Sequence, residues 1–468
     1  QCVDGTLSNR HYWYVARGLG AGSSGVGDSS AGVHRQGEMG GGAVSCWGWN
    51  YIGQLGDGTT TDRNTPTQTS SLGTGRTAVA ISSGGWHTCA ILDDASVSCW
   101  GWNYYGQLGD GTTTNRTTPT QTLSLGTGRT AVALSSGGWH TCAILDDASV
   151  SCWGSNNIGQ FGDGTYTDRN TPTQTSSLGT GRTAVAISSG GWHTCAILDD
   201  ASVSCWAWNR EGQLGDGTSI NHRITPTQTS SLGTGRTAVA ISSGDYHTCA
   251  ILDDGTVSCW GYNGGGGLGD GTTTVRNTPT QTSNLGTNLT AVAISSGERH
   301  TCAILDNASV SCWGYNNDGG LGDGTNSNRS TPTQTSSLGV GRTAVAISSG
   351  NRHTCALLDD ASVSCWGRNS GNLGDGTTID RNTPTQTSSL GVNRTVALSE
   401  RDFDNDGILT IFDVHQILDV RESSISSGAS HTCDLLYHAT VSCRGLQHFG
   451  PLGVVETTDL RTSTPHAR

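Results

Sequence analysis

The chain has little fixed charge and no lysine. Charged residues make up 13% of its 468 residues, every fixed cation is an arginine, and the formal net charge is −13. Binding to a phosphate backbone needs clustered positive charge, and the sequence has no basic run, so nucleic acid is not expected as a partner. No apolar run approaches the roughly 20 residues that a membrane-spanning helix requires, so no membrane span is expected.

Methionine occurs once, whereas glycine occurs 69 times. Without longer-range order, such a composition would be typical of a Gly/Ser-rich disordered chain. Regularly spaced Trp, Leu, Val and Ile argue instead for an ordered all-β protein of short strands and tight turns. The chain begins at Gln1 rather than methionine, so we expect a processed or truncated form without its signal segment.

One stretch of sequence recurs nearly every 53 residues, with the pattern Ser-Ser-Gly-x-x-His-Thr-Cys-Ala-Ile-Leu-Asp-Asp-Ala-Ser-Val-Ser-Cys-Trp-Gly. The Ser-Ser pairs that open its eight copies begin at Ser29, Ser82, Ser135, Ser188, Ser242, Ser295, Ser348 and Ser426. Each unit is too short to bury its own apolar face, so the units must stack on one another. Four short strands per unit favour a β-propeller of seven to eight blades over a β-helix.

Each copy also predicts a β-hairpin. In one copy the strands that carry Cys89 and Cys99 are joined by the three-residue loop Asp93–Ala95. If the two cysteines face each other, their side chains are close enough for a cross-strand disulfide, and the third loop residue should be left-handed. Gly255 meets that need in another copy, but most copies have alanine there, which the sequence does not explain.

The cysteines indicate an oxidising compartment. Fourteen of the 16 form pairs with the same separation: Cys89 with Cys99, Cys142 with Cys152, Cys195 with Cys205, Cys249 with Cys259, Cys302 with Cys312, Cys355 with Cys365, and Cys433 with Cys443. The remaining Cys2 and Cys46 could bridge each other. Paired cysteines in a repeat are typical of disulfides in an extracellular or cell-surface protein. The alternative, zinc, is disfavoured because the histidine near each pair supplies only a third ligand.

The repeated units resemble the regulator of chromosome condensation repeat family, in a secreted variety with paired cysteines. The resemblance is carried in one copy by His140-Thr141, Ala143–Leu145, Val150, Trp153-Gly154-x-Asn156 and Gly159-Gln160. It covers nearly the whole chain and implies a β-propeller, usually of seven blades. Because one fold hosts many functions, it implies little about activity.

Both ends of the chain carry the same part of the repeat. Gln1–Thr6 resembles Gln54–Thr59, and the segment from Gly450 to Gly453 repeats that phase. Either an irregular eighth unit leaves one terminus loose, or a terminal segment packs on a neighbouring molecule. We divide the chain into propeller repeats at 1–398 with a degenerate first unit, an inserted segment at 399–425, and a last repeat with a C-terminal segment at 426–468.

The inserted segment resembles an EF-hand or dockerin calcium loop. Its expected ligands are Asp402, Asp404, Asp406, Ile408 by its carbonyl, Thr410 and Asp413. The last ligand is Asp where Glu is usual, which reaches less far. We expect a structural calcium ion and no organic cofactor, the alternative being an acidic loop without metal.

A histidine and a tryptophan recur at fixed positions of the unit. A catalytic histidine needs a unique constellation, so the copies from His87 to His431 are expected to make structural hydrogen bonds to neighbouring blades. The repeated tryptophans, from Trp47 to Trp366, are expected in the core. No nucleophile–base pair stands out, so we do not expect an enzyme.

Positions that differ between copies are the candidates for a binding face. They precede the repeated histidine or follow the Trp-Gly pair: Trp86, Trp139, Trp192, Tyr246, Arg299 and Arg352, and Trp49, Trp102, Trp208, Tyr262, Tyr315 and Arg368. Trp, Tyr and Arg are enriched at interfaces, and the alternative is packing against adjacent loops. Glycosylation is possible at the sequons of Asn115, Asn288, Asn307, Asn328 and Asn393.

Taken together, the sequence predicts a secreted, disulfide-bonded propeller that acts as an extracellular structural or surface protein and associates with itself, in filaments for example. The alternative is a monomeric recognition module that binds glycans or another protein. A guanine-nucleotide exchange factor, the activity that the resemblance suggests, conflicts with the paired cysteines and is the least expected.

Overall fold

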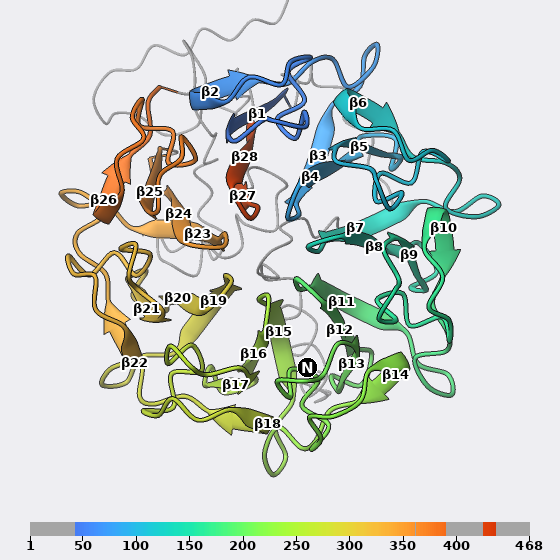
Figure 1. Cartoon of the computed structure of the whole chain (residues 1–468). Coiled ribbons are helices and arrows are strands. Elements are labelled where there is room, and N and C mark those ends of the chain that lie inside the picture. The colour runs from blue at the N-terminus through green and yellow to red at the C-terminus, as the bar shows by residue number, and fades with distance from the viewer. Residues whose placement is uncertain (1–42, 361, 390–424, 437–468) are drawn as a thin grey trace, which may run out of the picture.

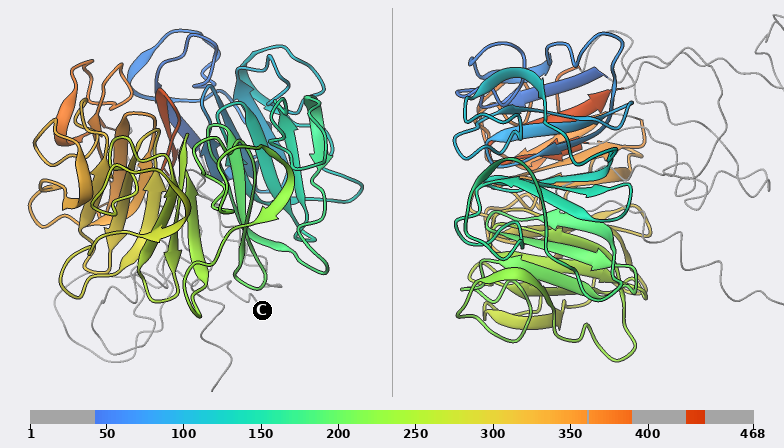
Figure 2. Two further views of the ribbon diagram at one scale, coloured as in Figure 1. Left: turned by 60° about the horizontal axis from the view of Figure 1, so that its bottom comes forward. Right: turned by 90° about the vertical axis from the view of Figure 1, so that its right-hand side faces the viewer.

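The structure is a computed structural model that describes residues 43–360, 362–389 and 425–436. These residues form seven four-stranded antiparallel sheets and contain no helix. The sheets radiate from a central axis (Figure 1) and together form a flat disc when seen from the side (Figure 2). The all-β class and the propeller are therefore confirmed, with seven blades. The eighth unit, counted from Ser29, lies outside the described residues.

Six blades are continuous in sequence, and each runs from an inner strand at the axis to an outer strand at the rim. The first three are β3 (Ala78–Ser83), β4 (His87–Leu92), β5 (Val97–Gly101) and β6 (Arg116–Gln121); β7 (Ala131–Ser136), β8 (His140–Leu145), β9 (Val150–Gly154) and β10 (Arg169–Gln174); and β11 (Ala184–Ser189), β12 (His193–Leu198), β13 (Val203–Ala207) and β14 (Arg223–Gln228). The next three are β15 (Ala238–Ser243), β16 (His247–Leu252), β17 (Val257–Gly261) and β18 (Arg276–Gln281); β19 (Ala291–Ser296), β20 (His300–Leu305), β21 (Val310–Gly314) and β22 (Arg329–Gln334); and β23 (Ala344–Ser349), β24 (His353–Leu358), β25 (Val363–Gly367) and β26 (Arg381–Gln386).

The seventh blade joins the two ends of the ring. Its strands are β27 (Ile425–Ser427) and β28 (His431–Leu436) from the C-terminal part and β1 (Ala43–Gly48) and β2 (Arg63–Gln68) from the N-terminal part. In the register of β1 and β28, Cys46 lies opposite Cys433, and a disulfide joins them. The predicted pairing of Cys433 with Cys443 and of Cys2 with Cys46 is therefore wrong, because the partner strand of β28 comes from the other end of the chain. Cys2 and Cys443 lie outside the described residues.

The predicted hairpin register is confirmed in the other blades. Cys89 lies opposite Cys99, and the amide of Leu92 donates to the carbonyl of Ser96 at 2.8 Å, which leaves the predicted three-residue loop. The third loop residue is left-handed whether it is glycine or alanine, with φ of +61° at Ala95. The alanine copies thus accept a conformation that glycine adopts at lower cost.

Each of the six continuous blades has one disulfide between its two central strands, at the same place in the register. The bonded pairs are Cys89 with Cys99, Cys142 with Cys152, Cys195 with Cys205, Cys249 with Cys259, Cys302 with Cys312, and Cys355 with Cys365. These six predicted pairs are therefore confirmed, and the disagreement over the cysteines is confined to the closing blade.

The hydrophobic core lies between neighbouring blades. Trp153 of the second blade is fully buried and packs against Ile91, Val97 and Leu108 of the first. Gly109 permits this contact, because a Cβ there would come within 2.9 Å of the indole. All seven repeated tryptophans, from Trp47 to Trp366, are fully buried, which confirms the expectation that they form the core.

A ring of hydrogen bonds also links the blades. Nε2 of His87 lies 2.8 Å from Oγ1 of Thr141 in the next blade, and that hydroxyl donates to the carbonyl of Gln107. Since the threonine hydrogen is engaged, the imidazole must be protonated at Nε2 to donate. The contact recurs around the disc and closes between His431 and Thr88 at 3.0 Å. The structural role predicted for the histidines is confirmed.

Candidate functional site

Two loops of every blade emerge at the same end of the disc, because the strands are antiparallel. The first, between the inner and second strands, is called the axial loop here and comprises residues 84–86 in the first blade. The second leaves the blade after the buried Trp-Gly pair and begins at Trp102 in that blade. The amide of Trp102 donates to the carbonyl of Trp86 at 2.9 Å, so the backbone fixes the two side chains side by side. All the predicted binding-face residues occupy these two positions.

These residues form one surface, called the aromatic–arginine face here. Its aromatic half comes from the closing blade and the first three blades, and consists of Trp49, Trp86, Trp102, Trp139, Trp192 and Trp208. Its arginine half comes from the next three blades, and consists of Tyr246, Tyr262, Arg299, Tyr315, Arg352 and Arg368. The structure thus brings together residues that lie more than 300 positions apart in the sequence.

The aromatic half is a chain of ring contacts that crosses blade boundaries. The indoles of Trp102 and Trp139, from adjacent blades, have centroids 4.7 Å apart in an edge-to-face arrangement. Trp139 and Trp192 follow at 6.1 Å. The ring centroids of Trp49, in the closing blade, and Trp86 lie 5.8 Å apart, and Trp49 is 38% exposed. Aromatic pairs at such distances stabilise one another, so this half presents a firm apolar surface.

In the arginine half, the contacts between neighbouring blades are made by arginine guanidinium groups that lie over tyrosine rings. The guanidinium of Arg299 lies 5.7 Å from the ring of Tyr246 and 5.5 Å from that of Tyr262, both in the preceding blade. Arg352 lies 5.8 Å from the ring of Tyr315 in the same relation. The position before the repeated histidine therefore covers the ring of the preceding blade in both halves, with an indole in one half and a guanidinium in the other.

Acidic side chains partly neutralise the two arginines. Glu298 accepts a hydrogen bond from Nε of Arg352 at 3.3 Å, and it forms an ion pair with Arg299, whose Nε lies 3.2 Å from its carboxylate. Asp318 lies 3.5 Å from Nη1 of Arg352. These ion pairs help to hold the arginines over the tyrosines, and they balance part of the arginines' charge within the protein.

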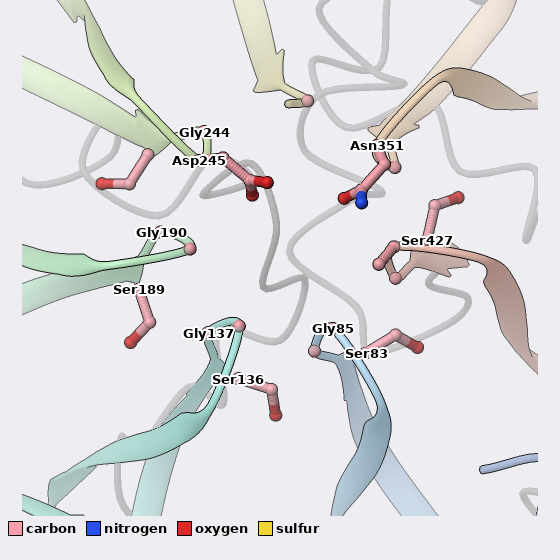
Figure 3. Close-up of a pocket in the computed structure, with 18 of the residues that line it drawn as sticks. Ser83, Gly85, Ser136, Gly137, Ser189, Gly190, Gly244, Asp245, Asn351 and Ser427 are labelled. Carbon is pink, nitrogen blue, oxygen red and sulfur yellow. The ribbon is translucent and has the colours of Figure 1, made fainter. Parts of the chain in front are cut away.

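The axial loops surround a small cavity where the blades converge, with a volume of about 50 Å³. Glycine and serine line most of it, and the side chains of Asp245 and Asn351 point into it (Figure 3). Burial, reinforced by nearby Glu298, raises the pKa of Asp245 to about 7. Asp245 lies against Gly191, where a Cβ would come within 2.8 Å of the carboxylate oxygen. Asp245 is therefore the one acidic residue among the described residues that line this cavity.

The repeated histidines take no part in this surface. Burial lowers the pKa of His87 to about 3, and the other six copies are lowered to about 3 or 4 in the same way. They are neutral at pH 7, which agrees with their structural hydrogen bonds. The Gly-Asp-Gly segments are also structural, since Asp57 accepts from Thr59 and pairs with Arg63 at 2.7 Å.

The other predicted sites have mixed outcomes. Asn115, Asn288, Asn307 and Asn328 are exposed, while Asn393 and the six expected calcium ligands from Asp402 to Asp413 lie outside the described residues. Within the part of the chain that the structure describes, no group of three or more metal-ligating side chains is brought together. In that same part, no helix is long and apolar enough to cross a membrane.

The sequence analysis missed several residues of the face. Tyr104 and Tyr105 extend the aromatic half, with Tyr105 6.2 Å from Trp139. His222 stacks on Trp208 at 5.1 Å. Asp245 was also missed, although Gly85, Gly138 and Gly191 occupy its position in other copies. That change from glycine to a charged residue was the available signal.

Comparisons with known proteins agree with this architecture. The RCC1-like domain family matches residues 43–402. The chain is 31% identical over 366 residues to the ultraviolet-B receptor UVR8 of Arabidopsis thaliana, covering 78% of this chain and 82% of that protein. It is 32% identical over 343 residues to the human E3 ubiquitin-protein ligase HERC2, covering 72% of this chain and only 7% of that protein.

The solved structures show the same fold. Prp20p from Saccharomyces cerevisiae, described with its binding to Gsp1p and histones, superposes with a TM-score of 0.71 at 18% identity, covering 88% of this chain and 97% of that one. Human WBSCR16 superposes with a TM-score of 0.70 at 18% identity, covering 86% of this chain and all of that one. At these identities the likeness concerns the fold alone. Taken with the match over residues 43–402, the seven repeated blades place this chain in the RCC1-like domain family.

Proposed function

We propose that this protein is an extracellular recognition module that binds another protein through the aromatic–arginine face. The observation that carries the proposal is the continuity of that face, in which surface Trp, Tyr and Arg from all seven blades meet at one end of the disc. Such residues dominate the binding energy of protein interfaces. A binding role also agrees with the comparisons, since the Prp20p structure is described with its binding to Gsp1p and histones.

An oxidising location is supported by the cysteines. All seven disulfides of the described residues are fully buried within sheets, as Cys142 and Cys152 illustrate. Buried disulfides in a repeated scaffold are typical of secreted or surface-exposed proteins. A structural calcium ion in the loop from Asp402 to Asp413 remains part of the proposal, on the basis of its sequence pattern alone.

Affinity capture from the source organism's secreted fraction tests the main proposal. The variant with both Trp102→Ala and Trp139→Ala should bind its partner with about 30-fold lower affinity, because two central aromatic anchors are removed. Asp147→Asn, on a hairpin loop at the other end of the disc, is the control and should retain the partner. Equal capture by all three forms would contradict the assignment of the face.

Self-association is the second candidate, and the division of the face favours it. A two-fold axis would place the aromatic half of one copy over the arginine half of another, as a self-complementary contact requires. Sedimentation velocity over a range of concentrations measures it. A dimer that dissociates when Trp102 and Trp139 are changed to Ala supports self-association, and a monomer at every concentration contradicts it. Growth into filaments requires a second contact outside this face.

A further inference from the structure

We infer that the axial cavity of the aromatic–arginine face takes an ammonium group from the bound protein, a lysine side chain that pairs with Asp245. The inference rests on the proposed recognition function and names the chemistry of the partner. Because this chain contains no lysine, the partner is then a different protein.

The first support is the isolation of the Asp245 carboxylate. No described residue donates a hydrogen bond to it, whereas Glu298 next to it pairs with both Arg299 and Arg352. An ammonium group would supply a positive charge and the hydrogen-bond donors that this carboxylate lacks within the described part of the protein. Burial and the negative charge of Glu298 raise the pKa of Asp245 to about 7 against the opposing charge of Arg299, so a bound ammonium group would favour the ionised carboxylate.

The second support is the size and chemistry of the cavity. Its volume of about 50 Å³ is several times the roughly 10–15 Å³ that a cavity needs to hold one water molecule, so it has room for a compact head group. Asn351, two blades further round the ring, points into the cavity from the side facing Asp245 and offers an amide oxygen as a further acceptor (Figure 3). An ammonium group has three donors and no acceptor, which suits such a lining.

The third support is the aromatic surround. The axial loops that place Gly138 and Gly191 at the cavity continue directly into Trp139 and Trp192. A lysine stem entering the cavity would pass these indoles, and cations are attracted to indole faces. The protein itself uses this contact elsewhere on the face, where Arg299 covers Tyr246 and Tyr262.

Glycine at the corresponding positions of other blades provides a suitable variant. Gly85, Gly138 and Gly191 occupy the position of Asp245 in three blades. Asp245→Gly therefore restores a residue that the repeat already accepts, and removes the carboxylate with little risk to folding. Asp245→Asn keeps the shape and removes only the charge. Asp147→Asn, at the other end of the disc, removes one charge elsewhere as the matched control.

Isothermal titration with a hexalysine peptide at low ionic strength tests the inference, with the fully side-chain-acetylated peptide as the uncharged probe. The unmodified protein should bind hexalysine and not the acetylated form. Asp245→Asn and Asp245→Gly should each weaken binding about tenfold or more, while Asp147→Asn should change it by about twofold at most. Equal weakening by all three variants would show general charge attraction and overturn the assignment.

The pH dependence supplies a second measurement. Asp245 faces Glu298, whose charge raises its pKa, and Arg299, whose charge lowers it; Tyr246 is next to it in the chain. Hexalysine should therefore bind more tightly at pH 8, where Asp245 is ionised, than at pH 6. Affinity that is the same at both pH values contradicts the role of Asp245.

The two proposals fail in different ways. If the native partner is lost with the Trp102 and Trp139 variants but bound normally by Asp245→Gly, the recognition function stands and the lysine assignment is wrong. If hexalysine binding depends on Asp245 but no protein depends on the two tryptophans, the cavity assignment stands and the recognition function is wrong.

Discussion

Changing Cys46 and Cys433 to Ala would remove the disulfide that joins the two ends of the ring. This disulfide spans 387 positions, whereas each of the other six spans 10. In the chain-entropy account, a disulfide stabilises the folded state by restricting the unfolded chain, and the effect grows with the logarithm of the loop length. The closing disulfide should therefore contribute more than any hairpin disulfide.

The magnitude follows from the two loop lengths. The relation gives about 6 kcal/mol for the ring-closing loop and about 3 kcal/mol for a hairpin loop at 25 °C. The matched comparison is Cys142→Ala with Cys152→Ala, in the second blade. Both pairs are fully buried, so the cavities left by removal of the sulfur atoms are alike. The difference of about 3 kcal/mol thus isolates the effect of loop length.

Equilibrium unfolding in guanidinium chloride, followed by tryptophan fluorescence, measures both variants against the unmodified protein. Thiol titration of each folded variant confirms that the other disulfides are intact. Losses that agree within about 1 kcal/mol would refute the reasoning, because they would show that loop length in the unfolded chain does not set the contribution. A larger loss for the second-blade variant would refute it as well.

Three further predictions concern the repeated positions. Ala148→Gly should raise the free energy of unfolding by about 1 kcal/mol, since Ala148 has a φ of +62°, and a lower denaturation midpoint would contradict this. Gly109→Ala should lower the melting temperature, because its Cβ would come within 2.9 Å of the buried Trp153 indole, and an unchanged value would oppose that packing argument. Lowering the pH from 7 to 5 should destabilise the protein. Burial lowers the pKa of His140 to about 3 in the folded state, whereas its pKa in the unfolded chain is about 6.5. The contribution of His140 to stability is therefore complete above about pH 6.5 and falls as the pH is lowered, by about 2 kcal/mol at pH 5. Seven such histidines outweigh Asp245, whose raised pKa acts in the opposite sense, so a denaturation midpoint that does not fall at pH 5 would contradict the burial argument.

Much of the blade could be predicted from sequence because its determinants are local. The spacing of Cys89 and Cys99 set the hairpin register, and the three-residue loop required a left-handed third residue. These features depend on residues within about ten positions of one another. Because the same residues recur in every copy of the repeat, the same prediction applied to the other continuous blades.

The closing blade was predicted wrongly because its determinants are distant. Cys433 and Cys443 have the same spacing as the other pairs, so the repeat alone favoured a seventh hairpin disulfide. The structure instead pairs β28 with β1, which brings Cys46 opposite Cys433. Nothing within either segment indicates this partner. It follows from ring closure, which requires one blade to be completed from both ends of the chain.

The location of the aromatic–arginine face could be predicted because structural coupling limits where a repeat can vary. Each His contacts a Thr of the next blade, and each buried Trp packs on the preceding blade, so a change at either position needs a matching change in a neighbour. At the surface, by contrast, the residue before the histidine of one blade contacts the residue after the Trp-Gly pair of the preceding blade, as Trp139 and Trp102 do. They can therefore change from indole to guanidinium while the core stays constant. Asp245 was not predicted as a site residue. Its proposed role depends on the absence of a hydrogen-bond donor to its carboxylate among the described residues, and the seven axial loops together determine that property.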